Sequence, residues 1–285
     1  MPWTTLIDAE TLQAVPATAD WVVVDCRFDL ADPDAGRLAW QRGHIPGAVY
    51  AHLERDLSGP VTAGRGRHPL PDPDALVAWL EHHGIGNETQ VVAYDHGPGG
   101  MAARLWWLLR WLGHEAVAVL DGGLAAWQRA GGELTDTDPE PRPRHYHAHP
   151  GALPTVETAS LAATLERFCV VDARAPERYR GEHEPVDPVA GHIPGAVSRP
   201  FTENLDEDGR FLAPQDLMSA WAPVLQAAGE RALVAQCGSG VTACHHVLAL
   251  AHAGLGDIAL YPGSWSEWIR DPSRPVATGE QPGGG

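Results

Sequence analysis

The strongest constraint on the fold of this chain is that it repeats itself. Three segments recur in the same order, as the pairs WVVVDCR (21–27) and FCVVDAR (168–174), RGHIPGAV (42–49) and AGHIPGAV (190–197), and LDGGLAAW (120–127) and YPGSWSEW (261–268). Ordered matches of this density indicate two copies of one domain, and two copies are too few for a solenoid. A length of 285 residues accommodates two domains comfortably.

The boundary between the copies lies in a segment rich in proline and charge. The stretch 135–154, TDTDPEPRPRHYHAHPGALP, has no apolar period. We therefore predict an N-terminal domain over 1–135, a linker over 136–154 and a C-terminal domain over 155–285. His145, His147 and His149 alternate in this linker, but no cysteine or carboxylate pattern accompanies them, so we interpret them as solvated linker residues rather than metal ligands.

Each copy alternates short apolar runs with helical segments. The expected strands are 21–25, 91–94 and 117–120 in the first copy and 169–172, 233–236 and 258–261 in the second. The expected helices are 73–83, 99–112, 122–130, 214–227, 241–253 and 264–269. This alternation predicts an α/β fold in which each domain has a parallel sheet with helices on both faces. Ligands bind such sheets beyond the carboxyl ends of the strands.

Cys237 follows a predicted strand directly and begins the turn CGSGVT, residues 237–242. When the copies are aligned, Asp95 stands opposite Cys237, so the strand–turn–helix frame does not itself require a cysteine. Gly238 and Gly240 let several backbone N–H groups point inward, and a helix beginning near Val241 adds the positive end of its dipole. Such surroundings lower the pKa of a thiol from about 8.5 to ~3.5–7.5, so we predict that Cys237 is a nucleophile.

A cysteine-based phosphatase is the first rival interpretation. Its loop needs an arginine six residues after the cysteine to hold the phosphate, whereas here Ala243 occupies that position and the loop has no basic residue. The sequence therefore argues against phosphatase chemistry.

Composition limits the classes of binding partner and the cellular compartment that we expect for this protein. A formal net charge of −17 argues against nucleic acid and against an acidic membrane surface. No signal peptide and no apolar run long enough to span a bilayer are evident. Four cysteines with irregular spacing favour a reducing compartment over a disulfide scaffold, so we expect a cytoplasmic protein.

Together these motifs are specific: the chain resembles tandem-domain rhodanese-type sulfurtransferases through DAR, GHIPGA, CGSGVTA and GSWSEW. The resemblance covers nearly the whole chain. It implies that the first domain, with Asp95, is catalytically inactive and that the second carries the active cysteine. It also implies no cofactor, because the sulfur travels as a covalent persulfide on Cys237.

The resemblance implies roles for particular residues. Ser239 would hydrogen-bond the donor as the serine of a Ser-His-Asp relay, whose other members would be His68 and Asp56. Arg178 would bind a carboxylate, and the remaining donor-binding positions would be Gly238, Gly240, Val241 and Thr242. His44 and Asp95 are 51 residues apart, but His192 and Cys237 only 45. We place the surplus in the 57–71 loop, reaching over the second domain.

The sequence of the same loop also predicts which molecule donates the sulfur. CGSGVT resembles the loop of 3-mercaptopyruvate sulfurtransferases, whereas thiosulfate-using members typically carry basic residues there. Arg178 is then the one fixed positive charge expected beside Cys237, because Val186 stands where mercaptopyruvate-specific relatives usually have a second arginine. We expect 3-mercaptopyruvate to be preferred over thiosulfate, the alternative donor, but by a smaller margin than in relatives that have both arginines.

The expected partners are a small sulfur donor and an acceptor such as cyanide, a small thiol or thioredoxin, and the expected oligomeric state is a monomer. A non-catalytic module that relays persulfide between proteins is the alternative from another class. The remaining conspicuous residues have simpler interpretations: Cys244, His245 and His246 as ordinary residues of a helix, and His44 and His192 as structural hydrogen-bonding groups.

Overall fold

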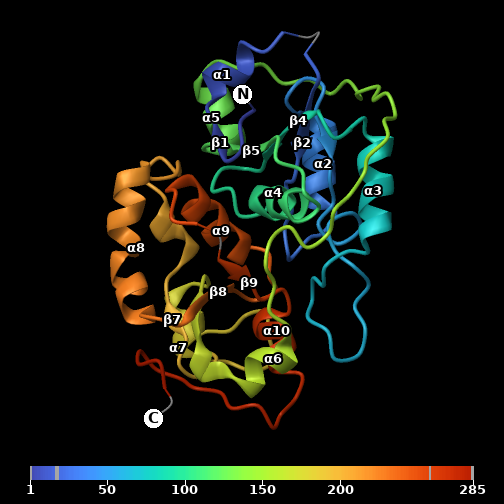
Figure 1. Cartoon of the computed structure of the whole chain (residues 1–285). Helices are drawn as coiled ribbons and strands as arrows, with labels where there is room; N and C mark the ends of the chain where they lie inside the picture. The colour runs from blue at the N-terminus through green and yellow to red at the C-terminus, as the bar shows by residue number, and fades with distance from the viewer. Residues whose placement is uncertain (1, 17–18, 257, 284–285) are drawn as a thin grey trace. The chain divides into compact units, whose positions relative to one another are not determined.

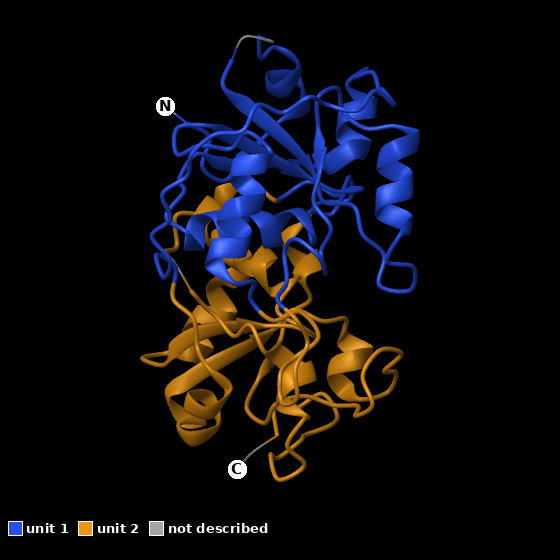
Figure 2. Ribbon diagram, turned by 90° about the vertical axis from the view of Figure 1, so that its right-hand side faces the viewer, with its two compact units in different colours: residues 1–59, 70–153, 206–211 blue, residues 60–69, 154–205, 212–285 orange. Residues whose placement is uncertain are grey.

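The computed structural model describes residues 2–16, 19–256 and 258–283, and the chain divides into two compact units (Figure 2). Unit 1 comprises residues 1–59, 70–153 and 206–211, and unit 2 comprises residues 60–69, 154–205 and 212–285. The sequence predicted contiguous domains over 1–135 and 155–285. In the structure, two short segments belong instead to the unit formed mainly by the other copy. Residues 60–69 of the first copy belong to unit 2, as expected for the long loop, and residues 206–211 of the second copy belong to unit 1.

Unit 1 is built on a parallel sheet of five strands in the order β1-β5-β4-β2-β3 (Figure 1). The strands are β1 Leu6–Ile7, β2 Trp21–Asp25, β3 Val49–Tyr50, β4 Gln90–Tyr94 and β5 Val117–Leu120. The helices are α1 Ala9–Gln13, α2 Ala35–Arg42, α3 Pro73–His82, α4 Ala102–Trp111 and α5 Gly123–Arg129.

The sheet of unit 1 is buried on both faces because alternate residues of its central strands point to opposite sides. Val92 and Tyr94 of β4 pack with Leu12 of α1 and with Leu124 and Trp127 of α5. Helix α4 contacts β4 and β5 and is itself buried along most of its length. Every residue of β4 is buried, which explains why this strand is an uninterrupted apolar run apart from its first residue, a glutamine.

Unit 2 has a parallel sheet of four strands in the order β7-β6-β8-β9 (Figure 1). The strands are β6 Phe168–Asp172, β7 Val197–Ser198, β8 Ala232–Gln236 and β9 Ala259–Leu260. The helices are α6 Thr158–Ala163, α7 Pro176–Arg180, α8 Pro214–Ala228, α9 Ala243–His252 and α10 Ser264–Trp268, with two 3₁₀ turns at Leu165–Arg167 and Phe201–Asn204.

The core of unit 2 repeats the arrangement of unit 1. Val170 of β6 and Val234 of β8 pack with Leu161 of α6, Tyr179 of α7 and Trp265 of α10. Helix α8 contacts β6, and α9 contacts β8 and β9. Both units therefore confirm the predicted parallel sheets with helices on both faces.

All six predicted strands and all six predicted helices are present, with ends shifted by up to three residues. The short elements β1, β3, β7, α1, α2, α6 and α7 were not predicted from the sequence, because two to eight residues give too little periodicity. Within the described residues, no helix has both the length and the apolar character needed to cross a bilayer.

Candidate active site

Cys237 directly follows β8, at the carboxyl end of the sheet of unit 2, and only 2% of its surface is exposed. Its N–H donates to Ser264 Oγ at 3.0 Å, and its carbonyl accepts the N–H of Trp265 at 3.0 Å. The N–H of Gly240 points back at the sulfur, with a nitrogen–sulfur distance of 3.2 Å. The cysteine is therefore held at both ends of its own backbone and on its side chain.

The turn that we call the Cys237 loop, residues 237–242, depends on one glycine. Gly240 has φ +77°, and a Cβ atom on it would lie 2.4 Å from Pro262 O, so no other residue fits. Helix α9 begins at Ala243, two residues later than expected from the sequence. Among the described residues, no group accepts the N–H of Ser239, Val241 or Thr242. These amides and the N-terminus of α9 make the loop a place where negative charge is stabilised.

The corresponding turn of unit 1, the Asp95 loop (residues 95–101), carries its own anion. Asp95 Oδ1 accepts the N–H groups of Gly97 and Gly99, both at 3.0 Å, and Oδ2 accepts those of Met101 and Ala102 at 2.9 and 3.2 Å. Four backbone amides that converge on one carboxylate show how strongly this turn suits an anion. In this turn the protein's own carboxylate therefore takes the place that an anionic ligand would occupy.

His68 and Ser239 lie together, as the sequence predicted from the resemblance. His68 Nδ1 is 2.7 Å from Ser239 Oγ, and both residues are buried. His68 belongs to the 60–69 segment, which is part of unit 2. A hydroxyl can donate to an unprotonated ring nitrogen or accept from a protonated one, so this pair can pass a proton in either direction.

Asp56, the third predicted member of the relay, belongs to unit 1. Its Oδ2 accepts the N–H of His52 at 2.7 Å, and its own N–H donates to His52 O at 2.9 Å. Burial raises the pKa of Asp56, which the hydrogen bond from His52 opposes. Its participation in a relay with His68 stays a prediction.

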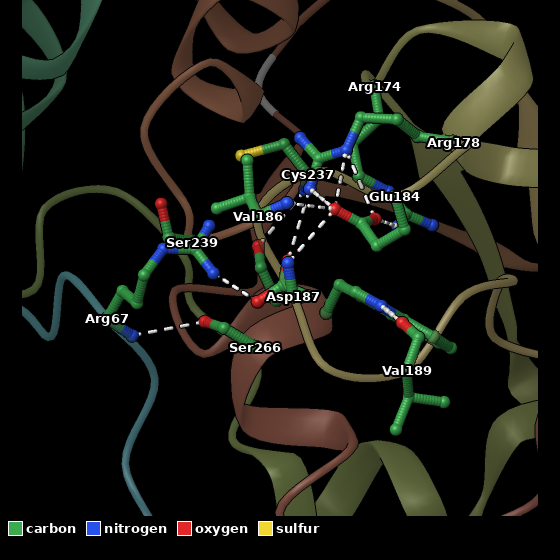
Figure 3. A network of polar contacts seen from close by, with 12 residues as sticks. Arg67, Arg174, Arg178, Glu184, Val186, Asp187, Val189, Cys237, Ser239 and Ser266 are labelled. Carbon is green, nitrogen blue, oxygen red and sulfur yellow. Dashed lines mark hydrogen bonds and ion pairs between the residues drawn. The ribbon is translucent and has the colours of Figure 1, made fainter. Parts of the chain in front are cut away.

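Arg178, on α7, is part of a dense set of ion pairs in unit 2 (Figure 3). Its Nε and Nη2 bind the Glu184 carboxylate at 2.7–3.1 Å, and its Nη2 also lies 3.1 Å from Asp187 Oδ2. Burial alone would raise the pKa of Glu184, but the hydrogen bonds from Arg178 and from the amides of Asp187 and Val186 outweigh it and lower the pKa. Val186 itself is exposed.

Arg174 is a further charged residue of unit 2 that interacts with Cys237. Its guanidinium binds Asp172 at 2.7 Å and lies 4.8 Å from the ring centre of Trp265. Burial alone would lower the pKa of Arg174, but Asp172, Glu184 and the Cys237 side chain raise it. The permanent charge of Arg174 therefore contributes to the potential at the sulfur.

The sequence reasoning missed Arg67, which pairs with Asp187 in unit 2. A Cβ atom built on Gly238 would lie 3.0 Å from Arg67 Nη2 and 3.5 Å from both terminal nitrogens of Arg178. The expectation of a single fixed positive charge beside the Cys237 loop was therefore wrong, because Arg174 and, from a distant segment, Arg67 add their charges to that of Arg178. The available signal was that Arg67 immediately precedes His68 in the surplus loop.

The remaining conspicuous residues have the structural roles expected of them. His44 and His192 each bind carbonyl oxygens through both ring nitrogens, at 2.8 and 3.2 Å in both cases. Cys244, His245 and His246 are buried residues of α9, and Asn204 Nδ2 lies 3.2 and 3.0 Å from the two histidine Nδ1 atoms. The described part of the chain contains no group of His, Cys, Asp and Glu able to hold a metal ion.

Residues 8–130 and 157–271 each match the sequence profile of the family described as the rhodanese-like domain. The chain is 52% identical over 279 residues to the probable 3-mercaptopyruvate sulfurtransferase of Pseudomonas aeruginosa, which covers 96% of this chain and 98% of that protein. It is 42% identical to the putative thiosulfate sulfurtransferase of Mycobacterium tuberculosis, over 96% of this chain and 97% of that protein.

Among solved structures, the 3-mercaptopyruvate sulfurtransferase of Leishmania major is similar, with a TM-score of 0.82 and 31% sequence identity. That match covers 94% of this chain and 76% of the other. The resemblance inferred from the motifs is therefore confirmed in sequence and in fold. The chain belongs to the rhodanese family and carries two copies of the rhodanese-like domain.

Proposed function

We propose that the protein is a sulfurtransferase that moves a sulfane sulfur from 3-mercaptopyruvate to a thiophilic acceptor through a persulfide on Cys237. The observation that carries the proposal is the Cys237 loop: a cysteine held next to backbone amides that have no acceptor in the described chain. The two curated relatives described above are both named sulfurtransferases, one of 3-mercaptopyruvate and one of thiosulfate.

In the first half-reaction, the Cys237 thiolate attacks the sulfur of 3-mercaptopyruvate. The new sulfur–sulfur bond forms as the carbon–sulfur bond breaks, and the electron pair moves to carbon as the enolate of pyruvate. The thiol proton of the donor ends on that carbon, so that pyruvate leaves and the persulfide remains. Ser239 and His68, 2.7 Å apart, are the groups proposed to hold and move this proton.

In the second half-reaction, a nucleophile such as cyanide attacks the outer sulfur of the persulfide. Thiocyanate leaves and the Cys237 thiolate is restored, so no cofactor is consumed. The N–H groups of Ser239, Val241 and Thr242, with that of Gly240, stabilise the negative charge on the persulfide between the two steps. A covalent intermediate of this kind gives ping-pong kinetics.

We assign Arg178 to the donor carboxylate, because a guanidinium binds a carboxylate through two parallel hydrogen bonds. Gly238 leaves space in front of this guanidinium, since it adds no side chain. Asp56 is assigned to His68 by the resemblance alone. Thioredoxin as the acceptor, a monomeric state and a cytoplasmic location stay predictions of the sequence.

The test is Cys237→Ser, with Cys244→Ala as the matched control, because Cys244 is a second buried cysteine near the loop. With 3-mercaptopyruvate and cyanide, Cys237→Ser should lose thiocyanate formation, while Cys244→Ala should retain it. Intact-protein mass spectrometry after the donor alone should show one added sulfur atom in the wild type and in Cys244→Ala, but not in Cys237→Ser. Retained turnover in Cys237→Ser would refute the mechanism, and no turnover of any small donor by the wild type would favour a protein-to-protein relay.

A further inference from the structure

We propose that Arg67 is a donor-binding residue that acts with Arg178 as a two-arginine site for the anionic end of the sulfur donor, and that this pair admits the thiosulfate dianion as well as 3-mercaptopyruvate. The proposal rests on the proposed function and adds to it a residue that determines donor specificity. It begins from the short distances between both guanidinium groups and the place that a Cβ atom on Gly238 would occupy.

The backbone of Arg67 is fixed by two residues of the motif GSWSEW. The Arg67 N–H donates to Ser266 Oγ at 3.1 Å, and the Gly66 N–H donates to Glu267 Oε2 at 3.0 Å. Glu267 is held in turn by the Thr158 hydroxyl, at 2.6 Å from its Oε1. The side chain of Arg67 therefore extends from an anchored point of unit 2, although it lies far away in the sequence.

One buried carboxylate holds both guanidinium groups in place (Figure 3). Asp187 Oδ1 accepts from Arg67 Nη1, and Asp187 Oδ2 accepts from Arg178 Nη2 at 3.1 Å. The side chain of Asp187 is only 2% exposed, compared with 25% for Arg67 and 17% for Arg178. Asp187 thus supports the pair from the protein side, while both arginines remain accessible to solvent.

The guanidinium atoms closest to Gly238 are the ones that the protein leaves available. Within the described residues, no acceptor binds Arg67 Nη2 or Arg178 Nη1. Arg67 Nη2 lies 3.0 Å, and Arg178 Nη1 3.5 Å, from the place where a Cβ of Gly238 would be. Gly238 directly follows Cys237 in the chain, so an anion bound to both nitrogens would lie next to the sulfur.

Two forked guanidinium groups suit an anion with several oxygens. The sulfonate end of thiosulfate has three oxygens and the molecule has two negative charges, so it gains from both arginines. The carboxylate of 3-mercaptopyruvate has one charge, and Arg178 alone can bind it. Arg67 should therefore matter more for thiosulfate than for 3-mercaptopyruvate.

The experiment compares Arg67→Ala with Arg65→Ala, which removes the same charge from the same segment. Arg65 faces solvent and pairs with exposed Glu157 at 3.7 Å, away from this network. For Arg67→Ala we expect kcat/KM for thiosulfate to fall about 10- to 100-fold, mainly through KM, because one charged hydrogen-bond donor to the substrate is lost. The fall for 3-mercaptopyruvate should be smaller, and Arg65→Ala should match the wild type with both donors.

A binding measurement separates this proposal from the proposed function. In the Cys237→Ser background no sulfur can be taken up, so calorimetric titration with thiosulfate reports affinity alone. Arg67→Ala should weaken that affinity, and Arg67→Lys, which keeps the charge but loses the fork, should weaken it less. If binding depends on Arg67 while the wild type transfers no sulfur, the proposed function fails and the two-arginine site stands.

The proposal is overturned if Arg67→Ala behaves like Arg65→Ala in both kinetics and binding. It is also overturned if Arg67→Ala weakens 3-mercaptopyruvate as much as thiosulfate. Far-ultraviolet circular dichroism and thermal melting establish that each variant is folded. If Arg67→Ala does not fold, Arg67→Gln and Arg67→Lys are compared with the wild type in its place, because both retain the aliphatic part of the side chain.

Discussion

The Asp95 loop and the Cys237 loop follow equivalent strands of the two units. They differ in whether the backbone N–H groups of the turn have an acceptor within the protein. In unit 1 the turn is filled from within, by a carboxylate that accepts four N–H groups. In unit 2 the cysteine sulfur accepts one, from Gly240. The difference shows how one fold yields either a turn closed by its own carboxylate or a loop in which several amides have no acceptor among the described residues.

A second difference lies in the segments that support these loops. Helix α5 of unit 1 begins with Gly123, at φ +55°, and carries Ala125 and Ala126. Helix α10 of unit 2 begins with Ser264, at φ +51°. Its next positions include Ser266 and Glu267, which bind the 60–69 segment. Unit 2 therefore has polar groups where α5 of unit 1 has alanines, and these groups hold the 60–69 segment.

The largest expected effect tests whether the Asp95 carboxylate is structural. Asp95→Ala leaves four amides without their acceptor, and we expect unit 1 to lose about 3–5 kcal/mol of free energy of unfolding, because each buried unsatisfied donor is costly. Urea unfolding measures the loss, and faster hydrogen exchange at Gly97, Gly99, Met101 and Ala102 localises it. Cys237→Ala, which removes one contact, is the control and should cost far less. Equal losses would contradict the comparison.

The second prediction makes α10 resemble α5. The double variant Ser266→Ala, Glu267→Ala removes both side chains that bind the backbone of the 60–69 segment. We expect kcat/KM for 3-mercaptopyruvate to fall by about 30-fold, since two hydrogen bonds of about 1 kcal/mol each are lost. Ser219→Ala, at an exposed site on α8, is the control. Unchanged kinetics in the double variant would mean that other contacts position Arg67 and His68.

The third prediction concerns pH, because the helices after the two loops bury different bases. Helix α4 buries Arg104, which keeps its charge at all working pH values, whereas α9 buries His246. Burial and the nearby Arg199 hold the pKa of His246 well below its usual 6.5. The folded state therefore keeps His246 neutral while the unfolded chain takes up a proton, so stability falls as the pH drops through about 6.5, by at most about 1.4 kcal/mol per pH unit.

Replacing His246 with Gln should flatten this dependence of the unfolding free energy between about pH 5 and 7. His183→Gln, on the exposed surface of unit 2, is the matched control and should leave the slope unchanged. Chemical unfolding at a series of pH values provides the measurement. If the His246→Gln slope equals that of the wild type, another group controls the acid sensitivity of this unit.

The smallest effect is expected at Ser264, whose left-handed backbone would suit glycine. Ser264→Gly relieves backbone strain of about 1 kcal/mol but loses two hydrogen bonds of about 1 kcal/mol each, which Ser264 Oγ accepts from the Cys237 N–H and donates to Tyr261 O. Its net effect should be a small loss of about 1 kcal/mol in the free energy of unfolding, with turnover reduced a few-fold. Ser264→Ala keeps the strain and loses both bonds, so it should be the less stable of the two in a thermal melt.

The sequence by itself determined much of this protein. The repeat showed two domains, and the apolar runs located the long strands and helices, because such periodicity depends only on neighbouring residues. The position of Cys237, at the end of a strand and before a helix, was predictable for the same reason. Asp95 opposite Cys237 also predicted from the sequence that the two turns would differ, and the structure shows a carboxylate that accepts four amides in one and a thiol in the other.

The tertiary structure alone decided which distant side chains meet at that cysteine. Arg67 lies beside Gly238, and His68 beside Ser239, across about 170 residues of sequence. Helix α7, which carries Arg178, is only five residues long and left no periodic signal. These contacts depend on how a loop of irregular backbone is anchored, here by Ser266 and Glu267, and that anchoring depends on the packed positions of groups that local sequence patterns do not encode.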